Sequence, residues 1–122
     1  MTDRKDAPFA FEGLDRVLHE KARLGILTSL ADYRDGLSFG ELRDLCGLTD
    51  GNLSRHVQTL EEAGLIEVTK GFEGRRPHTS CKLTPAGRQR FDDYLVVLEQ
   101  VLLRARGDAA SHIARPHKRK PI

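Results

Sequence analysis

The sequence has little that would suit a secreted, membrane-spanning or disulfide-bonded protein. Its two cysteines, Cys46 and Cys81, belong to no CxxC pair, and a chain with so few is not a disulfide scaffold. The longest apolar cluster, 95–103, is interrupted by Glu99 and Gln100, whereas a spanning helix needs roughly 20 apolar residues. The N-terminal residues contain no apolar core of signal-peptide length. These absences predict a cytoplasmic protein in a reducing compartment.

Motifs of the common enzyme classes are missing as well. There is no glycine-rich phosphate loop and no GxSxG sequence. Asp92 and Asp93 are adjacent in a predicted helix, where neighbouring side chains diverge by about 100° and do not readily share one site. The histidines and cysteines form neither an HxxxH nor a CxxC cluster. The sequence therefore predicts no enzyme, no cofactor and no metal site, and His56 is expected in a contact between helices.

The chain is short and nearly neutral, but its charges are unevenly spread. Its 122 residues fit one domain, with 20 Lys and Arg against 18 Asp and Glu. Basic residues dominate 70–84 and again 104–122. Local basic patches in a neutral chain point to an anionic partner.

Apolar spacing and capping residues predict a short series of helices. Apolar residues three and four apart predict a first helix over 14–33. Ser38 and Glu41 have the spacing of a capping box, and Gly47 can end the helix that they begin. Thr49 then caps another helix, which Gly64 ends. Phe39, Leu42 and Leu45 are the predicted buried stripe of the second helix, and Leu53, Val57 and Leu60 that of the third. Two short helices joined by about three residues form a helix-turn-helix arrangement.

A hairpin and a long helix are predicted to follow. Residues 66–69 and 79–83 alternate as strands do, and the Gly- and Pro-containing segment 71–77 is the predicted tip. Thr84-Pro85 is typical of a helix start, and the helix is expected to reach about Ala105. The predicted fold is mainly α with a small β-hairpin (α+β): a three-helix core that contains the helix-turn-helix, followed by the hairpin and a long C-terminal helix. Residues 1–12 are expected to be a flexible leader, 13–106 the domain with its terminal helix over about 84–106, and 107–122 a basic disordered tail.

The order of these elements resembles that of winged helix-turn-helix transcriptional regulators of the multiple-antibiotic-resistance-regulator (MarR) type. The resemblance lies in LSFGELRDLCGLTDGNLSRHVQTLEEAGLIEV and KGFEGRRPHTSCKLTPAGRQRF, and covers about residues 13–95. It implies that the third helix and the hairpin tip, which is the wing of the family, contact DNA.

The outward face of the third helix has the chemistry of base recognition. With Leu53, Val57 and Leu60 inward, Arg55 and Gln58 face outward, and these types read guanine and adenine in the major groove. The helix N-terminus suits phosphate. Glu61 and Glu62 are expected at the far end, away from the DNA backbone. The candidate DNA-binding residues of this helix are Thr49, Gly51, Asn52, Ser54, Arg55, Gln58 and Thr59. The alternative is an ordinary solvated helix face.

The predicted hairpin tip supplies a second contact. Arg75 and Arg76 at a tight turn can reach flanking phosphates or an adjacent minor groove. The alternative is a charged turn that keeps an edge hairpin soluble. A winged helix used only for protein–protein contact is the rival function, but such domains usually lack both a polar recognition face and a basic tip.

The long terminal helix has more apolar surface than one small domain needs. A seam with steps of three and four residues predicts a homodimer, and the candidate dimerisation residues are Phe91, Tyr94, Leu95, Leu98, Val101 and Leu102. The alternative is that the first helix, with Phe9 and Phe11, folds back over this surface. The chain has no ligand domain, so any small-molecule effector is expected in a cleft formed with a second subunit. Two recognition helices would then read half-sites about 34 Å apart.

Overall fold

The computed structural model describes residues 7–107, and its first helix is shorter than predicted. It begins at α1 (Lys21–Asp32), whereas the spacing predicted a start at residue 14. Local side-chain bonds explain the difference: Asp15 accepts from the Val17 amide at 2.9 Å, and Glu20 caps α1 by accepting from the Ala22 amide at 2.6 Å. Such bonds compete with a continuous helix. The apolar residues before α1 still pack on the core, and Leu18 is fully buried.

The helix-turn-helix has the predicted local structure. In α2 (Phe39–Cys46) the Ser38 hydroxyl and the Glu41 carboxylate form the capping box, and Gly47 ends the helix at φ 63°. Next, α3 (Asp50–Glu62) begins at the Thr49 cap. One expectation is wrong: Leu45 is 55% exposed, because no other element covers that side of α2, and it lines an open hollow instead.

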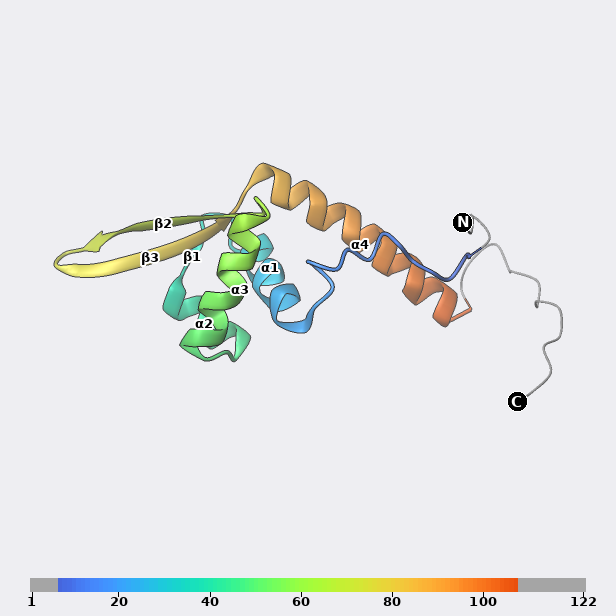
Figure 1. Cartoon of the computed structure of the whole chain (residues 1–122), viewed down its shortest axis with the longest axis horizontal. Helices are drawn as coiled ribbons and strands as arrows, with labels where there is room; N and C mark the ends of the chain where they lie inside the picture. The colour runs from blue at the N-terminus through green and yellow to red at the C-terminus, as the bar shows by residue number, and fades with distance from the viewer. Residues whose placement is uncertain (1–6, 108–122) are drawn as a thin grey trace.

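The predicted hairpin is part of a three-stranded antiparallel sheet. Strands β2 (Ile66–Glu73) and β3 (Arg76–Leu83) pair along their full length, and β1 (Leu37–Ser38) joins the other edge of β3. A two-residue strand has no sequence period of its own, so β1 was not predicted. The strands also extend into the segment expected as the tip. The turn is therefore confined to Gly74 and Arg75, with Gly74 at φ 67°, and a two-stranded wing projects from the core (Figure 1).

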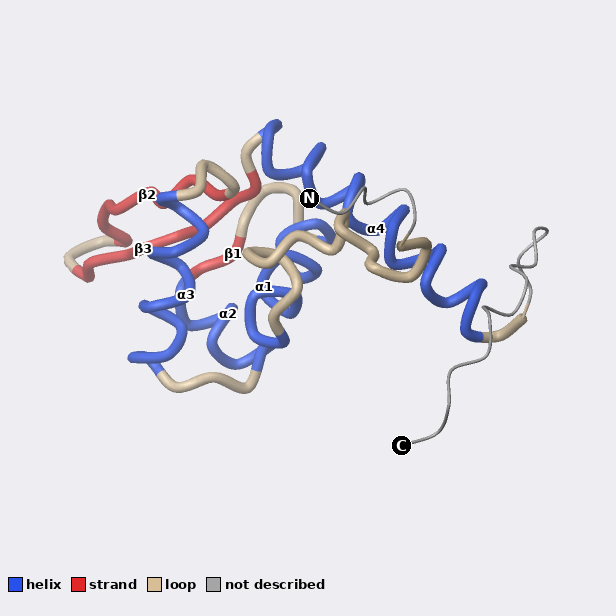
Figure 2. The backbone as a smooth tube through the Cα atoms, turned by 45° about the vertical axis from the view of Figure 1, so that its right-hand side comes forward, coloured by secondary structure: helices blue, strands red, loops and turns tan. Residues whose placement is uncertain are grey.

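The long helix α4 (Pro85–Ala105) begins as predicted, with the Thr84 hydroxyl accepting from the Gly87 amide at 2.8 Å. Its first half packs on the helical core through Phe91 and Tyr94. Its second half extends beyond the core, on the side opposite the wing (Figures 1 and 2).

The segment before α1 lies along this second half. Phe9 and Phe11, with ring centroids 6.3 Å apart, border Val101 and Ala105, and both views show residues 7–13 beside α4 (Figures 1 and 2). Residues 7–12, expected in a flexible leader, therefore make contacts, as the fold-back alternative anticipated for these phenylalanines. The cover is incomplete, since apolar side chains of α4 remain exposed. Most of the expected basic tail, 108–122, lies outside the described residues.

Candidate nucleic-acid interface

The outer face of α3 is polar and open to solvent. Gly51, Asn52, Ser54, Arg55 and Gln58 are all exposed, as their spacing predicted. A Cβ on Gly51 would meet nothing within 4 Å. The start of α3 can therefore be approached closely from outside.

Side-chain bonds hold several of these groups along the helix. The Thr49 hydroxyl accepts from the backbone amide of Asn52 at 3.2 Å, and the side-chain Oδ1 of Asn52 accepts from the Arg55 guanidinium at 3.4 Å. Gln58 donates to Glu62 at 3.1 Å. Thr59 departs from the prediction in part, because it is half-buried and its hydroxyl donates to the Arg55 carbonyl oxygen at 3.1 Å. Thr59 is therefore less available than its neighbours.

A groove of about 440 Å³ separates α3 from the wing. It is lined by Phe39, Ser54, Val57, Gln58, Glu61, Val68, Lys70 and Thr79. Ser54 and Gln58 of the outer face of α3 thus share one groove with Lys70 of the wing. Sequence reasoning did not single out Lys70 or Thr79 as site residues, although strand alternation places both on the side of Val68. Glu61, expected away from the DNA backbone, also borders this groove.

The wing tip is exposed from Thr69 to Pro77. The nearest ion pair in this hairpin joins Glu73 to His78 at 3.2 Å. Among the described residues, no carboxylate lies within 4 Å of Arg75 or Arg76. Both guanidinium groups are therefore available to an external anion.

The inner side of α3 is fixed by a polar contact with α1. His56 is 9% exposed, and its Nδ1 lies 3.2 Å from Arg23 and 3.4 Å from Glu20. This is the contact between helices that the sequence predicted for His56. Burial raises the pKa of Glu20, but the Ala22 amide and the charges of His56 and Arg23 outweigh it, so this pKa lies below its usual value. Across residues 7–107, no three His, Cys, Asp or Glu side chains gather as metal ligands would.

The apolar surface of α4 differs from the predicted seam. Phe91 and Tyr94 are 3% and 1% exposed, because they pack in the core of their own chain. The Tyr94 hydroxyl lies 2.5 Å from Nδ1 of His19. These two residues are therefore not available to a partner. Leu98 and Val101 are half-buried, and the exposed apolar residues are Leu95, Val96, Leu102 and Leu103.

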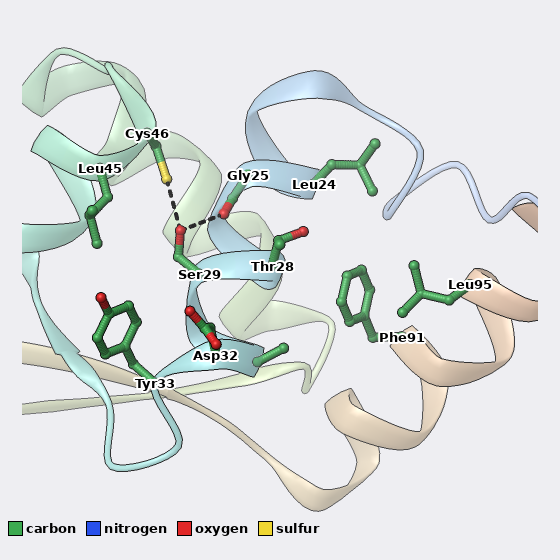
Figure 3. Close-up of a pocket in the computed structure, with 11 residues that line it drawn as sticks. Leu24, Gly25, Thr28, Ser29, Asp32, Tyr33, Leu45, Cys46, Phe91 and Leu95 are labelled. Atoms are coloured by element: carbon green, nitrogen blue, oxygen red, sulfur yellow. Dashed lines mark hydrogen bonds between the residues drawn. The ribbon is translucent and has the colours of Figure 1, made fainter.

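A wide hollow of about 810 Å³ lies between α1, α2 and α4 (Figure 3). Leu24, Phe91 and Leu95 form one side of it, and Tyr33 and Leu45 the other (Figure 3). Cys46 also lines it, with its sulfur 3.7 Å from the Ser29 hydroxyl. Leu95 belongs both to this hollow and to the exposed surface of α4, so the two are continuous.

Comparisons with known proteins agree with this architecture. Residues 22–102 match the family model of the winged helix DNA-binding domain. The chain is 38% identical over 86 residues to the uncharacterised protein MJ0432 of Methanocaldococcus jannaschii, covering 70% of this chain and 92% of that protein. No described helix is long and apolar enough to cross a membrane.

Solved structures share the same fold. A transcriptional regulator homologue from Pyrococcus horikoshii is 30% identical, with a TM-score of 0.70 over 75% of this chain and 89% of that one. A MarR-family regulator from Enterococcus faecalis is 20% identical, with a TM-score of 0.65 over 88% and 93% of the two chains. The M. tuberculosis regulator MosR, solved in complex with DNA, is 18% identical, with a TM-score of 0.59 over 89% and 80%.

The matched residues contain the whole helix-turn-helix, the wing and most of α4, while the fold is that of MarR regulators. The chain therefore belongs to the winged helix DNA-binding domain family, and it shares its fold with MarR-family transcriptional regulators.

Proposed function

We propose that this protein is a transcriptional regulator that binds specific duplex DNA as a homodimer, with α3 in the major groove and the wing on the backbone or in the minor groove. The observation that carries the proposal is the groove that Ser54 and Gln58 of α3 share with Lys70 of the wing. A phosphodiester strand would lie in this groove, with base edges on one side and the exposed tip on the other. The matched family is a DNA-binding domain, and MosR supplies a fold neighbour seen with DNA.

Base recognition would be carried by Arg55 and Gln58. Arg55 can donate two bonds to guanine O6 and N7, and Gln58 can pair with adenine N6 and N7. Both side chains must first leave their present partners, Asn52 and Glu62. These hydrogen bonds are exposed and weak, and water can replace them. Exchanging them for base contacts therefore costs little free energy.

The homodimer would form on the exposed part of α4. Leu95, Val96, Leu102 and Leu103 extend along a helix of 21 residues, about 32 Å at 1.5 Å per residue. Pairing would remove this apolar surface from water and relate two copies of α3 by a two-fold axis. Half-sites about 34 Å apart would then form a palindrome.

A small-molecule effector would be expected beside this interface. The hollow is continuous with the α4 surface through Leu95, so a second copy packed on α4 would border it. That arrangement corresponds to the two-subunit cleft that the sequence predicted. As a regulator of transcription, the protein would act in the cytoplasm, where it meets chromosomal DNA.

Selection of bound fragments from random duplex DNA tests the proposal. We expect a palindromic site, and we expect Arg55→Ala to weaken binding to it by about 1–3 kcal/mol and relax one base position. Arg106→Ala is the matched control, because Arg106 is exposed at the far end of α4. Failure to enrich any sequence would reject specific recognition. An Arg55→Ala variant as tight and selective as the wild type would show that α3 is not the reader.

A further inference from the structure

The wing carries the most exposed large apolar side chain of residues 7–107. Phe72 is 76% exposed, compared with 58% for Phe9 and Val96. Exposed apolar residues on a two-stranded ribbon promote pairing with other chains, and proteins usually place charges or proline there. A phenylalanine in this position therefore calls for a contact outside the chain.

Strand register shows which face of the wing carries the ring. Phe72 is opposite Pro77, and Lys70 is opposite Thr79. Because strand side chains alternate between faces, Phe72 and Pro77 lie on the same face as Lys70 and Val68. That face borders the groove beside α3. The apolar pair is thus the outer end of the surface on which DNA is proposed to lie.

The opposite face of the wing has different chemistry. Gly71 is opposite His78, and Glu73 is opposite Arg76. Glu73 and His78 are also joined by a 3.2 Å contact. The tip therefore has an apolar face toward the α3 groove and a charged face away from it.

Packing within the hairpin accounts for only part of the Phe72 surface. A cross-strand pair such as Phe72 and Pro77 contributes roughly 0.2–1 kcal/mol to a sheet. With three quarters of the side chain uncovered, most of the apolar area of the ring stays in water. A ligand that covers the tip would bury that apolar area and gain the free energy of removing it from water.

We propose that Phe72 inserts into the DNA minor groove next to the major groove occupied by α3 and packs on the deoxyribose walls. This inference rests on the proposed DNA-binding function. Glu73 at the tip lies five residues beyond Val68, which is half-buried, and five steps of about 3.3 Å span about 16 Å. That length passes one backbone and reaches a minor groove about 6 Å wide.

The arginines and the phenylalanine then have separate tasks. Arg75 and Arg76 hold phosphates, which gives salt-dependent and sequence-independent affinity. The Phe72 ring adds an uncharged contact, and apolar side chains in minor grooves favour base steps that unstack easily. The wing would therefore select deformable sequence at its contact point without hydrogen bonds to bases.

Variants of Phe72 test this on the selected duplex. We expect Phe72→Ala to weaken binding about tenfold with an unchanged salt slope, because no charge is removed. Burial of an aromatic ring is sufficient for a change of that size. Phe72→Leu should recover part of the affinity. Phe9→Ala is the matched control, since Phe9 is an exposed phenylalanine beside Val101 and Ala105 at the far end of α4 and should leave binding unchanged.

Fluorescence reports the insertion directly. The chain has no tryptophan, so Phe72→Trp introduces a single probe. On adding duplex we expect its emission to shift to the blue and its quenching by acrylamide to fall, while Phe9→Trp stays unchanged.

The outcomes separate this inference from the proposed function. Wild type that binds no duplex would reject both. Wild-type binding with an equally tight Phe72→Ala variant and a Phe72→Trp probe that remains open to quencher would reject only the insertion. Weaker Phe72→Ala binding with a flattened salt slope would also overturn it, because the substitution would then have displaced the arginines.

Discussion

Gly87 in the first turn of α4 lies directly against the backbone of Leu65, so that a Cβ on Gly87 would overlap the Leu65 carbonyl oxygen. The same junction contains two hydrogen bonds. The Thr84 hydroxyl donates to the Gly64 carbonyl oxygen at 2.7 Å, and the Thr84 backbone amide donates to the Leu65 carbonyl oxygen at 3.1 Å. The turn after α3, the base of the wing and the start of α4 therefore meet at one tight contact. This contact fixes the direction of α4 relative to α3.

Gly87→Ala should destabilise the fold although alanine is the better helix former. Intrinsic propensity favours alanine by about 1 kcal/mol, but the methyl group has no space and the backbone must shift. We expect a net loss of about 1–3 kcal/mol in the free energy of unfolding, measured with urea. Gly51→Ala in α3 is the matched control, because nothing lies within 4 Å of its Cβ, and it should keep or raise the stability by up to about 1 kcal/mol. A Gly87→Ala variant as stable as wild type would contradict the tight junction.

Replacing Arg75 and Arg76 together with alanine should weaken all duplex sequences alike. Since neither guanidinium has a carboxylate partner among the described residues, both are available to phosphate. We expect the slope of log affinity against log salt concentration to flatten by the contribution of roughly two phosphate contacts. The charge-matched control is the exposed pair Arg16→Ala and Arg106→Ala. An unchanged slope in the wing variant would mean that its arginines only keep the hairpin soluble.

Leu102→Glu should convert the proposed dimer into a monomer. Leu102 is 47% exposed on α4, so a charge there disturbs a partner surface more than the fold. Sedimentation at micromolar concentration should give about twice 13.7 kDa for the wild type and 13.7 kDa for the variant. Phe72→Glu, on the wing, should remain dimeric. A wild-type mass of 13.7 kDa would exclude the dimer.

The Asp15–Arg90 contact should contribute stability that acid removes. Arg90 Nε lies 2.6 Å from Asp15 Oδ2. This hydrogen bond lowers the pKa of Asp15 below its usual 3.8 and outweighs partial burial. Because the folded pKa is below the unfolded one, the stabilisation is present above about pH 4 and is lost as pH falls through the folded value.

Unfolding measurements with Asp15→Asn check this pH dependence. The wild type should be the more stable of the two at pH 6, and the difference should shrink as pH is lowered toward 3. Asp92→Asn, at an exposed position of α4, should differ little from wild type at either pH. A stability difference for Asp15→Asn that is independent of pH would show that the carboxylate charge does not stabilise this contact.

The sequence alone determined the features that depend on neighbouring residues. The capping box of Ser38 and Glu41, the turn at Gly47 and the Thr84-Pro85 start all follow from bonds that close within four residues. The polar face of α3 also followed, since helical periodicity and three apolar residues fix which side is outward.

Only the tertiary structure decided the features that depend on distant segments. The strand β1 exists because Leu37 and Ser38 meet β3 more than 40 residues later. Phe91 and Tyr94 do not belong to the predicted dimer seam, because they are buried in the core of their own chain. Leu45 is exposed because no other element packs over it. The groove that joins α3 to Lys70 likewise forms only where the wing folds back beside the helix. Apolar spacing along a helix shows that a face must be covered, but what covers it depends on contacts between residues far apart in the chain.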